Sequence, residues 1–113
     1  MVEYISVAKK LTAAAGASDS VILYTVPEAA KLKITHVRIH FPTGSNGLLE
    51  VALKAGLRYL YPTHNKASGD NTLWEFRTPQ ELTSGSIIEI EYTNNDSSNP
   101  HTCFILLEGA VER

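Results

Sequence analysis

The side chains best suited to metal binding or proton transfer gather where His36, Arg38 and His40 occupy alternate positions. On a helix, His36 and His40 would lie one turn apart and could share a metal ion. Residues 31–41, however, are rich in Ile, Val, Thr and Phe, which predicts a strand. Residues four apart on a strand are separated by about 13 Å, whereas a zinc–nitrogen bond is about 2.1 Å long. We therefore predict that the three side chains form a solvated outer strand face or a contact with another subunit.

The remaining histidines and the single cysteine show no pattern of a catalytic or metal site. His64 and His101 fall in loops without a nucleophile elbow, and these two alone cannot supply the ligand set of a small cupin-like enzyme. Cys103 lies among apolar residues, which predicts a buried thiol. Loops 65–71 and 94–100 each carry one carboxylate, whereas calcium needs about six or more oxygen ligands. We predict no enzyme activity, no metal and no cofactor.

Length and composition predict one globular domain over residues 1–113. Apolar residues make up 43% of the chain and charged residues 19%, which is typical of a folded protein. The formal net charge of −2 provides no basic field for nucleic acid or an anionic membrane. No apolar run approaches the roughly 20 residues that span a bilayer, and no signal peptide is visible in residues 1–10.

Turn-forming residues recur at short intervals and separate runs rich in Val, Ile, Leu, Tyr and Thr. This spacing predicts an all-β antiparallel sandwich of about eight strands, of the jelly-roll type. Residues 8–17 contain good helix formers, so a two-turn helix competes with the first strand. The expected strands are Tyr4–Lys10, Ser20–Val26, Lys31–Phe41, Leu48–Lys54, Leu57–Tyr61, Thr72–Arg77, Ser86–Thr93 and Thr102–Glu108.

The apolar alternation within residues 31–41 changes parity, from even at Ile34 to odd at Val37. A β-bulge inserts one extra residue into a strand and so shifts its alternation. We therefore predict a bulge near Thr35 and His36.

Two segments, residues 21–24 and 104–107, are apolar at every position. One face of an antiparallel sandwich strand normally meets water, so a strand that is apolar on both faces requires a second cover. We expect a neighbouring subunit to supply it, and acid to weaken that contact as histidines charge beside Arg38. The predicted interface residues are Val21, Leu23, His36, Arg38, His40, Ile105 and Leu107.

Aromatic residues support an alternative function, a lectin-like carbohydrate-binding module. Tyr59 and Tyr61 share one strand face, and exposed aromatic rings can stack on sugars. Together with Trp74 they are the predicted ligand-binding residues of this alternative. The competing interpretation is burial in the core or in an interface.

The stretch 21–41 resembles a pattern of small β-sandwich structural and decoration proteins from tailed phages and related viruses. The matching positions are Tyr24 to Pro27, which end one strand, and Ile34, Thr35 and Val37, which belong to the next. Ala29 and Ala30 stand where the pattern commonly has glycine. Residues 104–113 are also similar to the closing strand of such domains.

This resemblance covers about a third of the chain and carries no catalytic residue. It implies a capsid-decorating or capsid-building protein of the virion, assembled in the host cytoplasm. The expected partners are other copies of the chain, with a trimer favoured over a pentamer or hexamer, and a capsid lattice.

Overall fold

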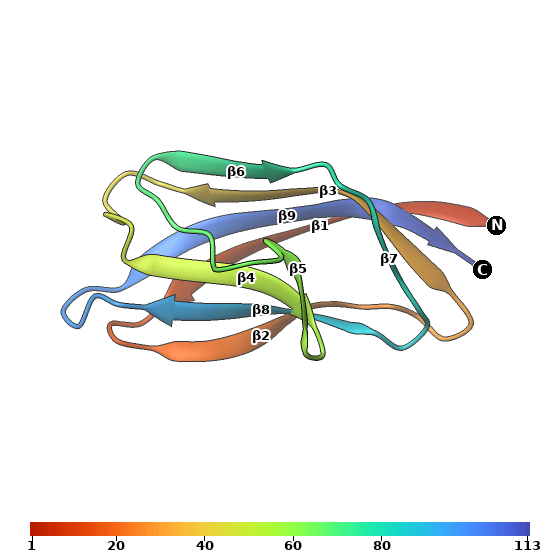
Figure 1. The fold of residues 1–113 in the computed structure, drawn as a ribbon, viewed down its shortest axis with the longest axis horizontal. Helices are drawn as coiled ribbons and strands as arrows, with labels where there is room; N and C mark the ends of the chain where they lie inside the picture. Colours follow the sequence, from red (N-terminus) through yellow and green to blue (C-terminus); the bar gives the residue numbers. More distant parts are fainter.

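The computed structural model describes residues 1–113, which form nine strands in two facing antiparallel sheets (Figure 1). No helix in it is long and apolar enough to cross a membrane. The strands are β1 (Val2–Ala13), β2 (Ser18–Thr25), β3 (Lys31–Phe41), β4 (Leu49–Ala55), β5 (Arg58–Tyr61), β6 (Thr72–Phe76), β7 (Gln80–Leu82), β8 (Ile87–Asn94) and β9 (His101–Glu112).

The strand order is that of a jelly roll. The first sheet has the order β1-β9-β3-β6, with β7 also paired to β3, and the second has the order β2-β8-β4-β5. The pairs nest inside one another along the chain: β1 pairs with β9, β2 with β8, β3 with β6 and β7, and β4 with β5. Such a nested ribbon folded across two sheets is the jelly-roll topology, which confirms the predicted fold class.

Only β3 has the predicted bounds, and β9 runs four residues past its predicted end, to Glu112. β1 runs without interruption from Val2 to Ala13, so the competing helix over residues 8–17 is absent. The short strand β7 was not predicted, because its three residues carry too little alternation to be recognised. The predicted bulge is confirmed, since the register of β3 against β9 shifts between Ile34 and His36.

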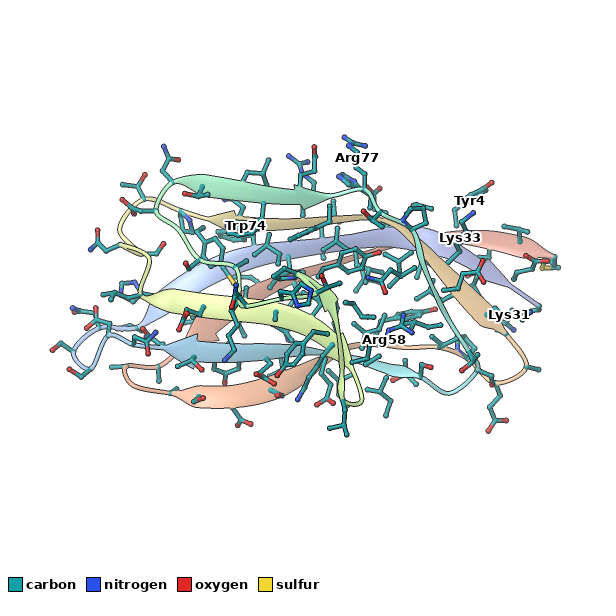
Figure 2. All side chains as sticks on the ribbon, in the orientation of Figure 1. Tyr4, Lys31, Lys33, Arg58, Trp74 and Arg77 are labelled. Atoms are coloured by element: carbon teal, nitrogen blue, oxygen red, sulfur yellow. The ribbon has the colours of Figure 1, made fainter.

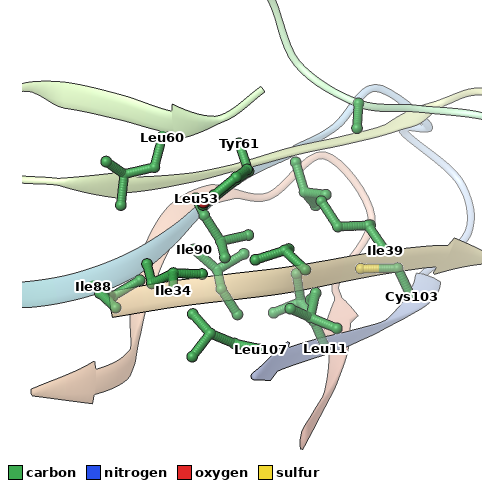
Figure 3. Packing of buried hydrophobic residues seen from close by; sticks show 14 of the residues in the cluster. Leu11, Ile34, Ile39, Leu53, Leu60, Tyr61, Ile88, Ile90, Cys103 and Leu107 are labelled. Carbon is green, nitrogen blue, oxygen red and sulfur yellow. The ribbon is translucent and has the colours of Figure 1, made fainter. Parts of the chain in front are cut away.

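The core lies between the sheets and contains 22 buried residues (Figure 3). Leu53 and Ile90 of the second sheet face Ile39 and Leu107 of the first, and all four are fully buried. Truncating a leucine in such a core to alanine costs about 2–5 kcal/mol, because a cavity remains. This core holds the sheets as a rigid support for their outer faces.

The two ends of the sandwich differ in what they present. Both termini lie at one end, and the loops β1–β2, β3–β4, β5–β6 and β8–β9 gather at the other (Figure 1). Buried Asn94 holds the loop end together, because its amide donates to the carbonyls of Ala13, Ala14 and Asn99 at 3.0–3.2 Å.

Candidate subunit interface

The outer face of the first sheet carries His36, Arg38 and His40 on β3, as predicted from their alternate spacing. Directly paired residues on neighbouring strands share a face, so these three residues and their partners form three rows across the sheet. His40 lies between Leu73 of β6 and Phe104 of β9, and Arg38 lies between Glu75 and Leu106. His36 pairs with Glu108 of β9.

His36 bridges two carboxylates. Its Nδ1 lies 2.8 Å from Glu108 Oε1 and its Nε2 lies 3.0 Å from Glu75 Oε2. Both ring nitrogens face carboxylate oxygens, so His36 links β6 and β9 across β3. Arg38 and Arg77 also approach Glu75, at 3.5 and 3.3 Å. The hydrogen bond from His36, with the nearby arginines, lowers the pKa of Glu75 from its usual value.

The other half of this face is apolar and open. The rings of His40 and Phe104 stack with their centroids 6.2 Å apart and their planes inclined by 28°. Phe104 is 44% exposed and Leu73 is 46% exposed. A shallow hollow of mainly apolar lining spans this region, and its walls include Ala8, Arg38, His40, Leu73, Phe104 and Leu106.

Four of the predicted interface residues do not lie on this outer face. Ile105 and Leu107 are 2% and 0% exposed and belong to the core of the chain itself, so the prediction is corrected to their outward neighbours Phe104 and Leu106. Val21 and Leu23 of β2 are half-buried against the same core. The register of β2 against β8 shifts between Ile22 and Tyr24, and Ile22 is the exposed side chain.

The missed residues Phe104, Leu106 and Leu73 had a signal in the sequence. Cys103 is buried as expected, with 0% exposure, and its burial raises the pKa of the thiol to about 12. Strict alternation from a buried Cys103 places Ile105 inside and Phe104 outside. Leu73 gave a weaker signal, since only its pairing with His40 brings it to this face.

The outer face of the second sheet is organised around Glu91. Lys54 Nζ lies 3.0 Å and Lys66 Nζ 3.4 Å from its carboxylate, and Tyr59 Oη donates to both oxygens at 3.0 Å. The hydrogen bond from Lys54 is the main cause of the lowered pKa of Glu91. Ala52 lies directly opposite Glu91 and is nevertheless 0% exposed. The region around Glu91 is therefore covered within the chain.

The three aromatic residues of the carbohydrate-binding alternative do not form one platform. Tyr61 is 2% exposed and its hydroxyl donates to the carbonyl of Thr78 at 2.6 Å. Trp74 packs against the core and its indole N–H donates to the carbonyl of Ser68 at 2.7 Å (Figure 2). Tyr59 stands apart on the outer face of the second sheet, bound to Glu91.

The polar loops hold a compact network without a metal-like cluster. Asp96 Oδ2 lies 2.8 Å from His101 Nε2, and its other oxygen accepts from the N–H groups of Ser98 and Asn99. The pKa of Asp96 is lowered to about 2, mainly by the backbone hydrogen bond from Ser98 and next by the side-chain hydrogen bond from His101. No group of three or more His, Cys, Asp or Glu residues is arranged to hold a metal ion.

Comparison with known proteins gives similarity of fold but not of sequence. No protein-family model matches the chain, and no curated protein matches it by sequence. A chain in the atomic structure of Sulfolobus Turreted Icosahedral Virus superposes with a TM-score of 0.64 at 11% identity. That match covers 97% of this chain, which spans only 30% of the length of the viral one.

Two phage capsid structures contain chains of similar extent. The match in the capsid of Helicobacter pylori bacteriophage KHP30 has a TM-score of 0.53 and 13% identity, and covers 96% of this chain and 93% of the other. The match in the capsid asymmetric unit of cyanophage Pam1 has a TM-score of 0.51 and 12% identity, with coverage of 96% and 84%. The predicted likeness to β-sandwich proteins of virus particles is thus confirmed at the level of the fold.

Proposed function

We propose that this chain is a non-enzymatic structural protein of a virus particle. In this proposal it is located in the virion and acts as a homo-oligomer, with a trimer favoured. Its mechanism is the burial of one sheet face between subunits, while the polar loop end docks on a capsid lattice. Decorating an existing capsid is the form that we favour over building the shell.

The observation that carries the proposal is the open apolar half of the outer face of the first sheet. Phe104 and Leu106 lie along the outer side of β9, and Leu73 of β6 lies across the ring of His40, which stacks on Phe104. A contiguous apolar patch rimmed by charged residues is typical of a surface that binds another protein. The charged rim is present, because Glu75, Arg38 and Arg77 follow directly along the same strands.

The fold supports the same function. A jelly roll covers both apolar sheet faces in its own interior, so further apolar surface on the outside has no role in folding the single chain. The similar chains in two phage capsid structures match over 84% or more of their own length. A single domain of this size therefore suits a component of a particle.

The loop end suits contact with a larger polar surface. The β3–β4 and β8–β9 loops line one shallow polar hollow, without a single hydrophobic side chain. Asp70 accepts from the backbone N–H groups of Gly44 and Asn46 at 2.6 and 3.3 Å, so one loop fixes another. Polar, pre-ordered loops of this kind lose little entropy on binding.

Gradient sedimentation and negative-stain electron microscopy of the concentrated protein test this proposal. We expect a discrete oligomer or particles, with no change on adding a panel of soluble glycans. A monomer at every concentration whose tryptophan fluorescence responds to a glycan would instead establish the carbohydrate-binding alternative.

A further inference from the structure

The free edge of the first sheet is formed by β1, which pairs with β9 on one side only. Its 12 residues pair in continuous register from Val2 to Ala13. The other edges are shorter or interrupted: β2 has a bulge, β5 has four residues and β6 has five. A long, regular, unpaired edge is a template for adding another strand.

The backbone groups that face this free edge follow from the pairing of the termini. Arg113 N–H donates to the Met1 carbonyl at 3.1 Å, and the Met1 amino group donates to the Arg113 carbonyl at 3.4 Å. In an antiparallel pair, residues that exchange hydrogen bonds alternate with residues that do not. Odd-numbered residues of β1 therefore bond to β9, and even-numbered residues direct their N–H and C=O groups outward.

The accessible part of the edge has a defined centre. Residues 2–10 are exposed or half-buried, whereas Leu11 and Ala13 are buried where the chain turns toward β2. Ser6 is the midpoint of residues 2–10. Tyr4, which is 85% exposed, lies near the end of the molecule that holds both termini (Figure 2).

We propose that β1 pairs antiparallel with β1 of a second copy about a twofold axis at Ser6. Ser6 then lies opposite Ser6 of the second copy, Tyr4 opposite Ala8, and Val2 opposite Lys10. All of these residues have outward N–H and C=O groups, so each pair exchanges two backbone hydrogen bonds. The two first sheets become one continuous sheet across the contact.

The side chains are complementary in this register. Glu3 lies opposite Lys9 of the second copy, and the twofold axis repeats this ion pair. Ile5 lies opposite Val7, so the apolar residues between the charges also meet. A slip of two residues sets Glu3 against Val7 or Leu11 and separates both charge pairs.

The lysines on β1 also give the contact its selectivity. Edge lysines deter pairing with arbitrary strands, because they leave a positive charge without a partner. Only a strand with a carboxylate at the matching position relieves this cost, and β1 itself carries one at Glu3. The occupant with matching chemistry is therefore a second copy of this chain.

The pairing of two β1 strands extends the proposed function. Only its biological role, and not the pairing itself, rests on that function. A threefold contact through the sheet face closes on itself, whereas a lattice requires a second, different contact. Pairing at the β1 edge provides a twofold contact that would connect trimers. The pairing itself is tested on the purified protein alone.

Register-specific cross-linking tests the contact directly. In the proposed register Ser6 and its copy have Cα atoms about 5.5 Å apart, which suits a disulfide. We expect Ser6→Cys to form a covalent dimer under mild oxidation at least ten times faster than Lys10→Cys. Lys10 is the matched control, since it lies on the same strand and face but about 27 Å from its copy. The native Cys103 is buried and does not compete.

Equal rates for the two cysteine variants, or faster linking of Lys10→Cys, would overturn the register. Charge reversal gives a second readout, the Ser6→Cys cross-linking rate. Adding Glu3→Lys or Lys9→Glu to Ser6→Cys should each slow the linking several-fold, and both together should restore it. Failure of the double reversal to restore the rate would contradict the Glu3–Lys9 pairing. In Phe104→Glu, which disrupts only the sheet-face contact, linking at Ser6 should persist, so the two contacts fail independently.

Discussion

The outer faces of the two sheets differ in whether their interactions are complete within one chain. On the second sheet, Glu91 gathers Lys54, Lys66 and Tyr59, and Lys66 reaches it from the β5–β6 loop. On the first sheet, the ionic cluster ends at Arg38 and leaves Phe104 and Leu73 nearly half exposed. Both faces belong to the same jelly roll, so the fold does not require this difference.

The difference supports the first sheet as the face that would bind another subunit in the proposed assembly. Single exposed apolar residues are normal, and the second sheet has two, Ile22 opposite Glu89 and Ile87, which are 59% and 42% exposed. On the first sheet, one hollow brings apolar residues of β6, β9 and β1 together around Arg38 and His40. A face closed by its own loop suits solvent, whereas an open apolar face suits a subunit.

The largest effect should come from a charge in the centre of the open face. Phe104→Glu is expected to abolish the sheet-face contact and to leave at most a dimer paired through β1, because a buried unpaired carboxylate costs several kcal/mol. Light scattering after size exclusion measures the mass. The matched control is Ile22→Glu, which places the same charge on the exposed outer face of the second sheet and should leave the mass unchanged. Equal loss of assembly in both variants would remove the distinction between the faces.

The closed face should contribute stability rather than assembly. Glu91→Ala is expected to lower the free energy of unfolding by about 1–2 kcal/mol, because its charged hydrogen-bond partners lose their acceptor. Urea denaturation measures this value, and Glu89→Ala on the same strand is the control. The oligomer mass should not change in either variant, and a change of mass in Glu91→Ala would show that the second face also assembles.

A smaller effect is expected at the loop end, on stability in strong acid. The pKa of Asp96 is lowered from 3.8 to about 2, so the stability that Asp96 contributes is complete above about pH 4 and is lost as the pH falls to about 2. Asp96→Asn should lower the melting temperature by a few degrees at pH 7 and flatten the acid decline over this interval. A melting curve in which wild type and variant decline in parallel from pH 4 to 2 would contradict the assignment.

The sequence predicted most of the fold because alternation and turn residues are local signals. Strand β3 was predicted from its residue types, and its bulge from the change of parity between Ile34 and Val37. The outward direction of His36, Arg38 and His40 followed from the same alternation. β7 was missed, since its pairing with β3 depends on tertiary contact rather than on local pattern.

The candidate interface was predicted only in part, for a physical reason. Residues 104–107 are apolar on both faces, so hydrophobicity does not distinguish the inner from the outer side. Choosing Ile105 and Leu107 for the interface inverted this strand. The two carboxylates around His36 come from strands distant in sequence, and only the register of the sheet brings Glu75 and Glu108 together.

The solution mass of the purified wild-type protein is the most direct test of whether the open face of the first sheet is a subunit interface. Light scattering after size exclusion, over a wide concentration range at pH 7.5, measures it. A subunit interface on the open face predicts a discrete oligomer, a trimer or a multiple of it, that persists on dilution to micromolar concentration. A monomer at all concentrations would contradict the claim that the open face of the first sheet is a subunit interface.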